Sequence, residues 1–460
     1  MRCPQSCALA LSAFLVGQIV QGAEQPADLV VLNGKIVTVN PHSSIVEAAA
    51  VREGRFVAVG ANSKVKKLVG DRTRVIDARG KTVVPGLIET HVHAIGVARD
   101  EAVQPFVQLS SIAEIQQWVR QQAQSTPKDE WIQIPRIDLT RLREGRLPTR
   151  SELDAATAEH PVVFNWQYGS RQIQVLNTAA LRAAKITRDT PDPTGGKTKI
   201  VKDAQGEPTG VLENPGGLTS KFRQSKPVSD EAFLAALKAV HRAYNRIGIT
   251  SVIERNSNVE GYRTYEKLKA AGELAVRATV TIGYTLIHAY FPNATAIRRA
   301  AELGVCVDTQ PAWYYKDGDA LAKALGEDRL KHFIGLADWR KGGLKVAINS
   351  DHMHGIDPNK SLNPFNPFLA MYVAVTRRTE SGRVIGPEQR VSREQALRMA
   401  TIDAAYLSFD EKRKGSIEVG KFRPLASHGT PWRYSKTGHR CDPRRRGRSG
   451  DHNRARHRVF

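Results

Sequence analysis

Two histidines separated by a single residue offer the clearest metal chemistry in this sequence. His91 and His93 end the stretch 83–93, which begins with apolar residues and bends at Pro85-Gly86. Side chains at i and i+2 of an extended segment project from the same face, so both imidazoles would point into one cavity. Imidazole suits a divalent ion such as zinc, and a catalytic site needs a few fixed ligands and one open position. A structural histidine pair is the alternative, because 13 histidines in 460 residues can produce this spacing by chance.

A carboxylate occupies a comparable position later in the chain. Asp351 follows the apolar stretch 346–348 and the turn-like pair Asn349-Ser350. The carboxyl ends of barrel strands are where such folds build their active sites. There Asp351 could bind a metal and take a proton from water, the general-base role in metal-assisted hydrolysis. An aspartate in an exposed loop is the alternative.

Length and composition favour a large exported globular protein. Hydrophobic residues make up 41% of the 460 positions, which is enough to build a sizeable core. The basic start, the apolar stretch 7–20 and the small residues that follow are typical of a secretory signal peptide over residues 1–23. We therefore expect a periplasmic or secreted protein without a membrane span. Removal of Cys3 and Cys7 would leave two cysteines, which excludes a disulfide framework or a cysteine metal site.

The net charge of +22 raises the question of a nucleic-acid partner. Residues 423–460 hold eleven Lys/Arg and two Asp, so this tail supplies a large part of the positive charge. Its only aromatic side chains before the final residue are Trp432 and Tyr434, and bases have few rings to stack on. We expect no nucleic-acid partner and treat a nucleic-acid binder as the least favoured function.

The rest of the chain predicts a β-domain followed by alternating strands and helices. β-rich stretches between residues 27 and 60 predict the β-domain, and Asn33-Gly34 between two of them predicts a hairpin. Alternation after His93 favours a parallel sheet or barrel. Strands are expected at 161–164, 249–253, 276–282, 305–309 and 345–348, and helices at 112–124, 232–247, 262–271, 294–303 and from a capping box at Ser392 and Gln395 to about Ser408. This gives six or seven barrel strands, whereas a (β/α)8 barrel needs eight.

Several short motifs in this order resemble the amidohydrolase superfamily, specifically its amidohydrolase-3 branch, which includes N-substituted formamide deformylase-like enzymes. The motifs are Pro-Gly-Leu-Ile at 85–88, Asn-Thr-Ala-Ala-Leu at 177–181, Gly-Glu-Pro-Thr-Gly at 206–210, Gly-Ile-Thr-Ser at 248–251, Thr-Gln-Pro at 309–311, Asn-Ser-Asp at 349–351 and Gly-Ser-Ile-Glu-Val-Gly-Lys at 415–421. The resemblance covers most of residues 27–422. It implies an α/β fold, a metal-bearing (β/α)8 barrel of the TIM type beside a small β-sandwich built from both chain ends. It also implies hydrolysis of C–N bonds in amide-like or cyclic amide substrates.

The same resemblance implies roles for individual residues. His91 and His93 match the first-strand metal ligands, and Ser350-Asp351-His352 resembles the last-strand signature. His288 is similar to another ligand of the family, although Ile287 stands where that motif usually has Glu. Without the resemblance, His288 reads as a satisfied core or loop histidine. Glu213 and Glu254 lie in matching segments and either could face the cavity, although strand-end glutamates are commonly solvated. His352 and His354 are expected in a loop near the substrate.

The sequence departs from the family pattern in two places. Only 36 residues separate Ser251 from His288, which leaves no room for the Lys-bearing strand and the His-bearing strand expected there. Barrel units should therefore be missing between about residues 282 and 287, which would leave open strand edges. After Phe422 the expected sandwich strand is replaced by the arginine-rich tail, and we hypothesise a frameshift in the coding sequence.

These observations predict a metal-dependent amidohydrolase that acts on non-peptide, amide-like C–N bonds of a small molecule by a metal-activated water. Its β-sandwich part would span residues 24–84, its barrel 85–422 and its non-family tail 423–460. His91, His93, His288 and Asp351 would hold the metal, expected to be zinc, and Asp351 would also act in catalysis. The competing prediction is a truncated and frameshifted amidohydrolase-like protein without activity. The substrate, nuclearity and oligomeric state are open.

Overall fold

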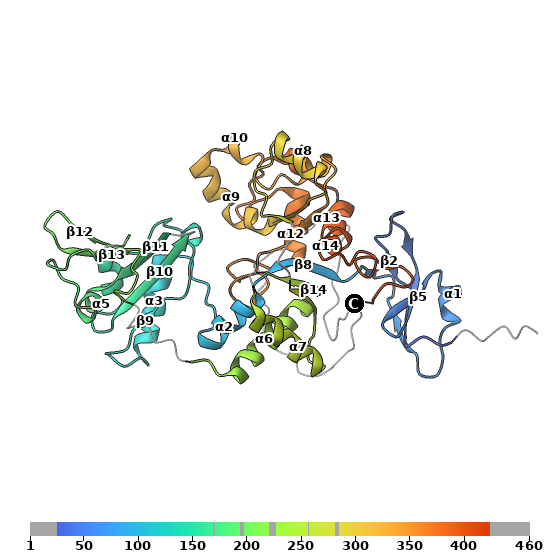
Figure 1. Ribbon diagram of the computed structural model, residues 1–460, viewed down its shortest axis with the longest axis horizontal. Helices are drawn as coiled ribbons and strands as arrows, with labels where there is room; N and C mark the ends of the chain where they lie inside the picture. Colours follow the sequence, from blue (N-terminus) through green and yellow to red (C-terminus); the bar gives the residue numbers. More distant parts are fainter. Residues whose placement is uncertain are drawn as a thin grey trace, which may run out of the picture.

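The computed structural model describes residues 25–168, 171–193, 197–219, 227–255, 257–280 and 285–423. The expected signal peptide and the tail beyond Arg423 lie outside these residues and stay predictions. Figure 1 shows three regions: small sheets near the N-terminus in blue, a central group of strands and helices, and a separate sheet in green.

The N-terminal region contains two small sheets. One has the order β5-β4-β1-β6 and the other β3-β2-β7. Their strands are β1 (Leu29–Leu32), β4 (Ala48–Arg52), β5 (Arg55–Gly60) and β6 (Arg74–Asp77), and β2 (Lys35–Val37), β3 (Ile45–Val46) and β7 (Thr82–Val83), with helix α1 (Asn62–Lys66) beside the first sheet. The last part of the family-like region returns here, because the Phe56 N–H donates to the Lys421 carbonyl and Phe422 bridges to Arg55.

The hairpin predicted at Asn33-Gly34 is wrong. Asn33 does turn the chain, with a φ of 55°, but β1 and β2 belong to different sheets. Past the turn, the Gly34 N–H donates to the Glu47 carbonyl and the Lys35 N–H to the Lys81 carbonyl. β1 buries Val30 in one apolar cluster and packs Leu29 and Val31 against a second cluster that contains Ile36 of β2, so packing of β1 and β2 in different sheets overrides the local turn preference.

The central region contains six strands in two parallel sheets. The orders are β15-β14-β8 and β16-β17-β18, and every pairing within them is parallel. The strands are β8 (Leu87–Val92), β14 (Ile249–Glu254), β15 (Arg277–Val280), β16 (Thr285–Ile287), β17 (Cys306–Thr309) and β18 (Val346–Ile348). A parallel bridge between Val92 and His352 brings the end of β8 beside the chain that leaves β18. Within the described ranges, no further strand pairs with the outer edge of β15 or β16.

Helices surround these strands and share a large apolar core with them. They are α2 (Ala94–Val103), α6 (Asp230–Arg246), α7 (Val259–Ala270), α8 (Ala294–Glu302), α9 (Pro311–Leu325), α10 (Glu327–Leu330), α11 (Leu336–Lys341), α12 (Pro367–Thr376) and α13 (Arg393–Met399). Helix α14 (Ile402–Tyr406) packs on a smaller cluster with residues of β8, β14 and β18. The capping box of Ser392 and Gln395 is confirmed at the start of α13. The single helix expected to reach Ser408 is instead two, because the backbone leaves the helical conformation at Thr401. None of the helices seen in these ranges is long and apolar enough to cross a membrane.

The third region is a five-stranded sheet inserted between α2 and α6. Its order is β12-β13-β11-β10-β9, with β9 (Ile132–Gln133), β10 (Val162–Tyr168), β11 (Arg171–Leu176), β12 (Lys199–Lys202) and β13 (Pro208–Glu213), and helices α3 (Ile112–Ala123), α4 (Arg150–Asp154) and α5 (Thr178–Ala183) pack on it. The strand expected at 161–164 exists as β10, but it pairs antiparallel with β11 and is no barrel strand. The insertion buries its own apolar clusters, so its sequence alternates like a barrel segment without belonging to one.

His241 on α6 is predicted to make stability sensitive to acid. Its ring is fully buried against Tyr265, and neither ring nitrogen has a hydrogen-bond partner in the described part of the chain. Burial lowers the pKa of His241 to about 4. Above pH 6.5 the residue is neutral in both states, but below it the unfolded chain binds the proton first, so stability falls as the pH drops towards 4. We expect this histidine to cost about 2 kcal/mol between pH 7.5 and pH 5.

A comparison of His241→Phe with wild type in thermal melts at the two pH values measures this contribution. Between pH 7.5 and pH 5 the melting temperature of the variant should fall by less than that of wild type. Replacement of the exposed His42 by Phe should leave the wild-type pH dependence unchanged. An equal fall in melting temperature in wild type and His241→Phe would show that His241 does not cause the acid sensitivity.

Candidate metal centre

Three predicted residues meet at the carboxyl ends of β8 and β18. His91 lies on β8, His93 follows it, and Asp351 lies three residues beyond β18. Asp351 Oδ1 is 3.2 Å from His91 Nε2 and 3.1 Å from His93 Nε2. One donor atom from each of the three residues lies within 4.8 Å of the others. The extended backbone of β8 thus turns both imidazoles towards one carboxylate, as the i and i+2 spacing predicts.

Burial and proximity set the protonation of these groups. His91 is buried, and desolvation lowers its pKa to about 3, which leaves the imidazole neutral and able to bind a metal. Burial opposes charge on His93 as well, but the Asp351 carboxylate outweighs it and raises the pKa of His93. Burial would raise the pKa of Asp351, and the neighbouring imidazoles of His93 and His91 instead hold that pKa below its ordinary value.

The donor set fits a divalent cation. His91 Nδ1 is buried and makes no hydrogen bond with any described residue, whereas Asp351 Oδ1, also buried, is held by its close contacts with the two Nε2 atoms. Buried polar atoms without partners are rare and call for an ion, a water or a functional explanation. Two imidazole nitrogens and a carboxylate oxygen are ligands that zinc and similar ions accept. The site therefore has the donor chemistry of a metal centre, because one donor atom from each of the three residues converges there.

His288 lies beside this group without joining its three donor atoms. It follows β16, and its ring stacks on that of His91 with centroids 5.3 Å apart. Its Nδ1 is 3.0 Å from Gln310 Oε1, and Trp313 stacks on it at 5.8 Å. His288 and Asp351 both have left-handed backbones, with φ of 68° and 50°. Such conformations cost energy in residues other than glycine and concentrate at functional sites.

Sequence reasoning missed the buried polar residues behind the centre. Glu89 is buried and accepts a hydrogen bond from the Ser350 N–H at 2.9 Å, and burial raises its pKa to about 8. Arg255 and Asp308 form a buried ion pair at 3.0 Å. The sequence did carry a signal for them, because Glu89 shares the period-two face of His91 and His93. Arg255 directly follows β14 and Asp308 is the residue before the last of β17, close to the strand ends where barrel folds place functional groups.

The other candidates have different surroundings. Glu254 is buried, and it accepts hydrogen bonds from the Tyr265 hydroxyl at 2.7 Å and the Ala94 N–H at 3.1 Å, so it holds the start of α2. Glu213 lies on β13 of the inserted sheet and pairs with Arg171. His352 is fully buried, with hydrogen bonds at both ring nitrogens to Tyr244 and Gly355. His354 pairs with Asp100 at 2.7 Å.

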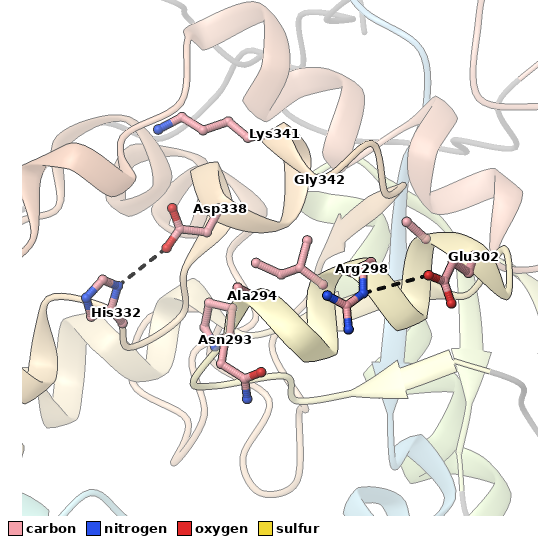
Figure 2. Close-up of a pocket in the computed structure, with 11 residues that line it drawn as sticks. Asn293, Ala294, Arg298, Glu302, His332, Asp338, Lys341 and Gly342 are labelled. Atoms are coloured by element: carbon pink, nitrogen blue, oxygen red, sulfur yellow. Dashed lines mark hydrogen bonds and ion pairs between the residues drawn. The ribbon is translucent and has the colours of Figure 1, made fainter.

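A surface pocket of about 780 Å³ lies between α8 and α11, away from these ligands. Figure 2 shows its charged side chains, which include the ion pairs His332–Asp338 at 3.4 Å and Arg298–Glu302 at 3.8 Å. None of the predicted metal ligands lines it. The pocket therefore gives no support to an alternative location for the active site.

Comparison with known proteins defines the class. The model of the amidohydrolase family matches residues 74–285 and 280–422, and the chain belongs to this family. It is 23% identical over 513 residues to an N-substituted formamide deformylase of Arthrobacter pascens, covering 86% of this chain and 92% of the relative. It is 29% identical over 496 residues to a putative amidohydrolase, YtcJ, of Bacillus subtilis, covering 84% and 91%.

A solved structure supports the same fold. A metal-dependent hydrolase from Pyrococcus horikoshii is 18% identical, with a TM-score of 0.59, and the match covers 86% of this chain and 95% of that protein. The predicted superfamily is therefore confirmed, and the fold is the TIM-barrel type of metal-dependent hydrolases. Membership places the chain among hydrolases that act on carbon–nitrogen bonds other than peptide bonds.

Proposed function

We propose that this chain is an exported, zinc-dependent amidohydrolase that cleaves an amide-like C–N bond of a small molecule. The observation that carries the proposal is the convergence of His91, His93 and Asp351, whose donor atoms lie within 4.8 Å of one another. The likeness to a protein named N-substituted formamide deformylase favours formamides and related amides as substrates. Export rests on residues 1–23 alone, and mass spectrometry of the mature chain should find a start near Glu24.

We assign different roles in the reaction to the histidines and to Asp351. When bound, a divalent metal polarises the substrate carbonyl and lowers the pKa of water. His91 and His93 would hold it as neutral ligands, with His288 as a further ligand from the facing sheet. Asp351 lies 3.1 Å from His93 and keeps a depressed pKa, so it is ionised and able to take the proton of the attacking water. The left-handed backbone of Asp351 is held by its N–H, which donates to Asn349 Oδ1 at 3.0 Å, and by its carbonyl, which accepts from Asn363 at 2.6 Å.

Metal content and turnover of the purified protein test this proposal together. We expect zinc bound to the wild-type chain, loss of hydrolysis of N-substituted formamides on chelation and recovery on addition of zinc. The control is a chelated sample given magnesium, which prefers oxygen ligands and should not restore activity. A folded protein that binds no zinc would contradict the metal centre, whereas bound zinc with no turnover on a panel of formamides and cyclic amides would contradict the substrate class.

A specific observation favours a second candidate, an inactive scaffold. β15 and β16 are separated by few residues, and their outer edges have no partner within the described ranges. The family match divides into two segments that meet at residues 280–285. The deformylase alignment runs over 513 residues, more than the 460 of this chain, so the relative has segments without a counterpart here. We infer that barrel units are missing between β15 and β16. Absence of both bound zinc and a cooperative melt would favour this candidate.

A further inference from the structure

A line of hydrogen-bonded side chains runs behind the centre from Asp308 to His288. Asn349 Nδ2 donates to Asp308 Oδ1, and Gln310 Nε2 donates to Asn349 Oδ1 at 2.9 Å. Gln310 Oε1 then lies 3.0 Å from His288 Nδ1. Asp308, Gln310 and Asn349 are all buried, so this line is shielded from competing water.

The direction of every hydrogen bond in this line is fixed by one backbone group. The Asp351 N–H lies 3.0 Å from Asn349 Oδ1, and a backbone N–H can only donate. The Asn349 atom that faces it is therefore the oxygen, and the Gln310 atom that faces the same oxygen must be the nitrogen. The remaining Gln310 atom, the one near His288, is then an acceptor. An acceptor at 3.0 Å requires a proton on His288 Nδ1.

We propose that Gln310 is a positioning residue that holds His288 as the Nδ1–H tautomer and leaves the lone pair on Nε2. Metal-bound histidines commonly donate their other ring N–H to an acceptor that fixes tautomer and orientation. The use of this lone pair as a metal ligand rests on the proposed function, but the tautomer itself does not. Asn349 also accepts the hydrogen bond of the Asp351 N–H, so it orients both Asp351 and, through Gln310, His288.

The backbone around His288 supports a positioning role rather than simple packing. The Thr309 hydroxyl donates to the His288 carbonyl at 2.6 Å, so consecutive residues hold the main chain and the ring. His288 has a φ of 68° and its ring is stacked on His91 and Trp313. A left-handed residue with its ring fixed on three sides is over-determined, as strained functional positions must be.

Histidine-labelled NMR of the metal-free protein at pH 8 tests the tautomer. The signal of His288 is identified by its loss in His288→Gln. We expect wild type to show Nδ1 protonated, Gln310→Glu to keep Nδ1 protonated because a carboxyl oxygen still accepts, and Gln310→Leu to shift towards the other tautomer. Gln174→Leu, which removes an equally buried glutamine bonded to Asn165 and Thr219, should leave His288 unchanged. An Nε2–H tautomer in wild type, or one unmoved by Gln310→Leu, overturns the proposal.

Zinc titration of the same variants separates this proposal from the proposed function. Gln310→Leu should weaken zinc binding by about 10–100-fold, and Gln310→Glu should stay closer to wild type. If Gln310→Leu changes the tautomer without changing zinc affinity, Gln310 positions His288 but His288 is no ligand, so the ligand assignment fails while the tautomer stands. If zinc affinity falls equally in Gln174→Leu, the loss reflects general destabilisation and the positioning role is contradicted.

Discussion

Replacement of both His91 and His93 by Asn is expected to remove bound zinc and lower kcat/KM by on the order of 10³-fold or more. The two Nε2 atoms are the only imidazole donors within 3.2 Å of Asp351 Oδ1 among the residues that the structure describes. Without them only Asp351 and the proposed further ligand His288 remain, which are too few to hold the ion. Metal analysis and steady-state kinetics on the same preparation measure both losses.

The matched control for this pair is His42→Asn with His332→Asn, which removes two exposed histidines remote from the centre. It should keep both zinc and turnover. Far-UV circular dichroism distinguishes loss of the site from loss of the fold. Turnover that survives in a folded, zinc-free double variant at His91 and His93 would refute the mechanism.

Asp351→Asn is expected to lower kcat by about 10²–10⁴-fold when zinc is saturating, the usual worth of a general base. The amide keeps the shape of the side chain and an oxygen that can ligate, but it cannot take a proton. Zinc binding should therefore weaken less than turnover does. Kinetics at several zinc concentrations separate the two effects.

Asp129→Asn serves as the control, because Asp129 is an exposed carboxylate on the inserted region. It should leave kcat unchanged. A kcat for Asp351→Asn within about tenfold of wild type would show that another group accepts the proton. Glu89, which is buried beside Ser350, would then be the next residue to replace.

The convergence of His91, His93 and Asp351 could be predicted because it depends on strand periodicity and on the position of strand ends, which short sequence patterns record. Helices such as α6 and α8 could be predicted for the same reason, since Ser229 and Asn293 cap the starts of clear apolar stripes. These features need only local information, and the structure places them close to the expected residues.

The features that were missed depend on long-range packing. Asn33-Gly34 has the local chemistry of a hairpin, yet the Gly34 N–H donates to the Glu47 carbonyl and the following Lys35 N–H to the Lys81 carbonyl, both far along the chain. β10 reads as a buried barrel strand, and only its antiparallel partner β11 shows that it belongs to an insertion. The pairing of Arg255 with Asp308 spans 53 residues, and no spacing rule connects them.

The most direct test of the metal centre is a crystal structure with anomalous scattering recorded on both sides of the zinc absorption edge. We expect one peak in contact with His91 Nε2, His93 Nε2 and Asp351 Oδ1 when the protein has been given one equivalent of zinc. A difference map without a peak at this position, or with zinc bound only elsewhere on the chain, would contradict this expectation.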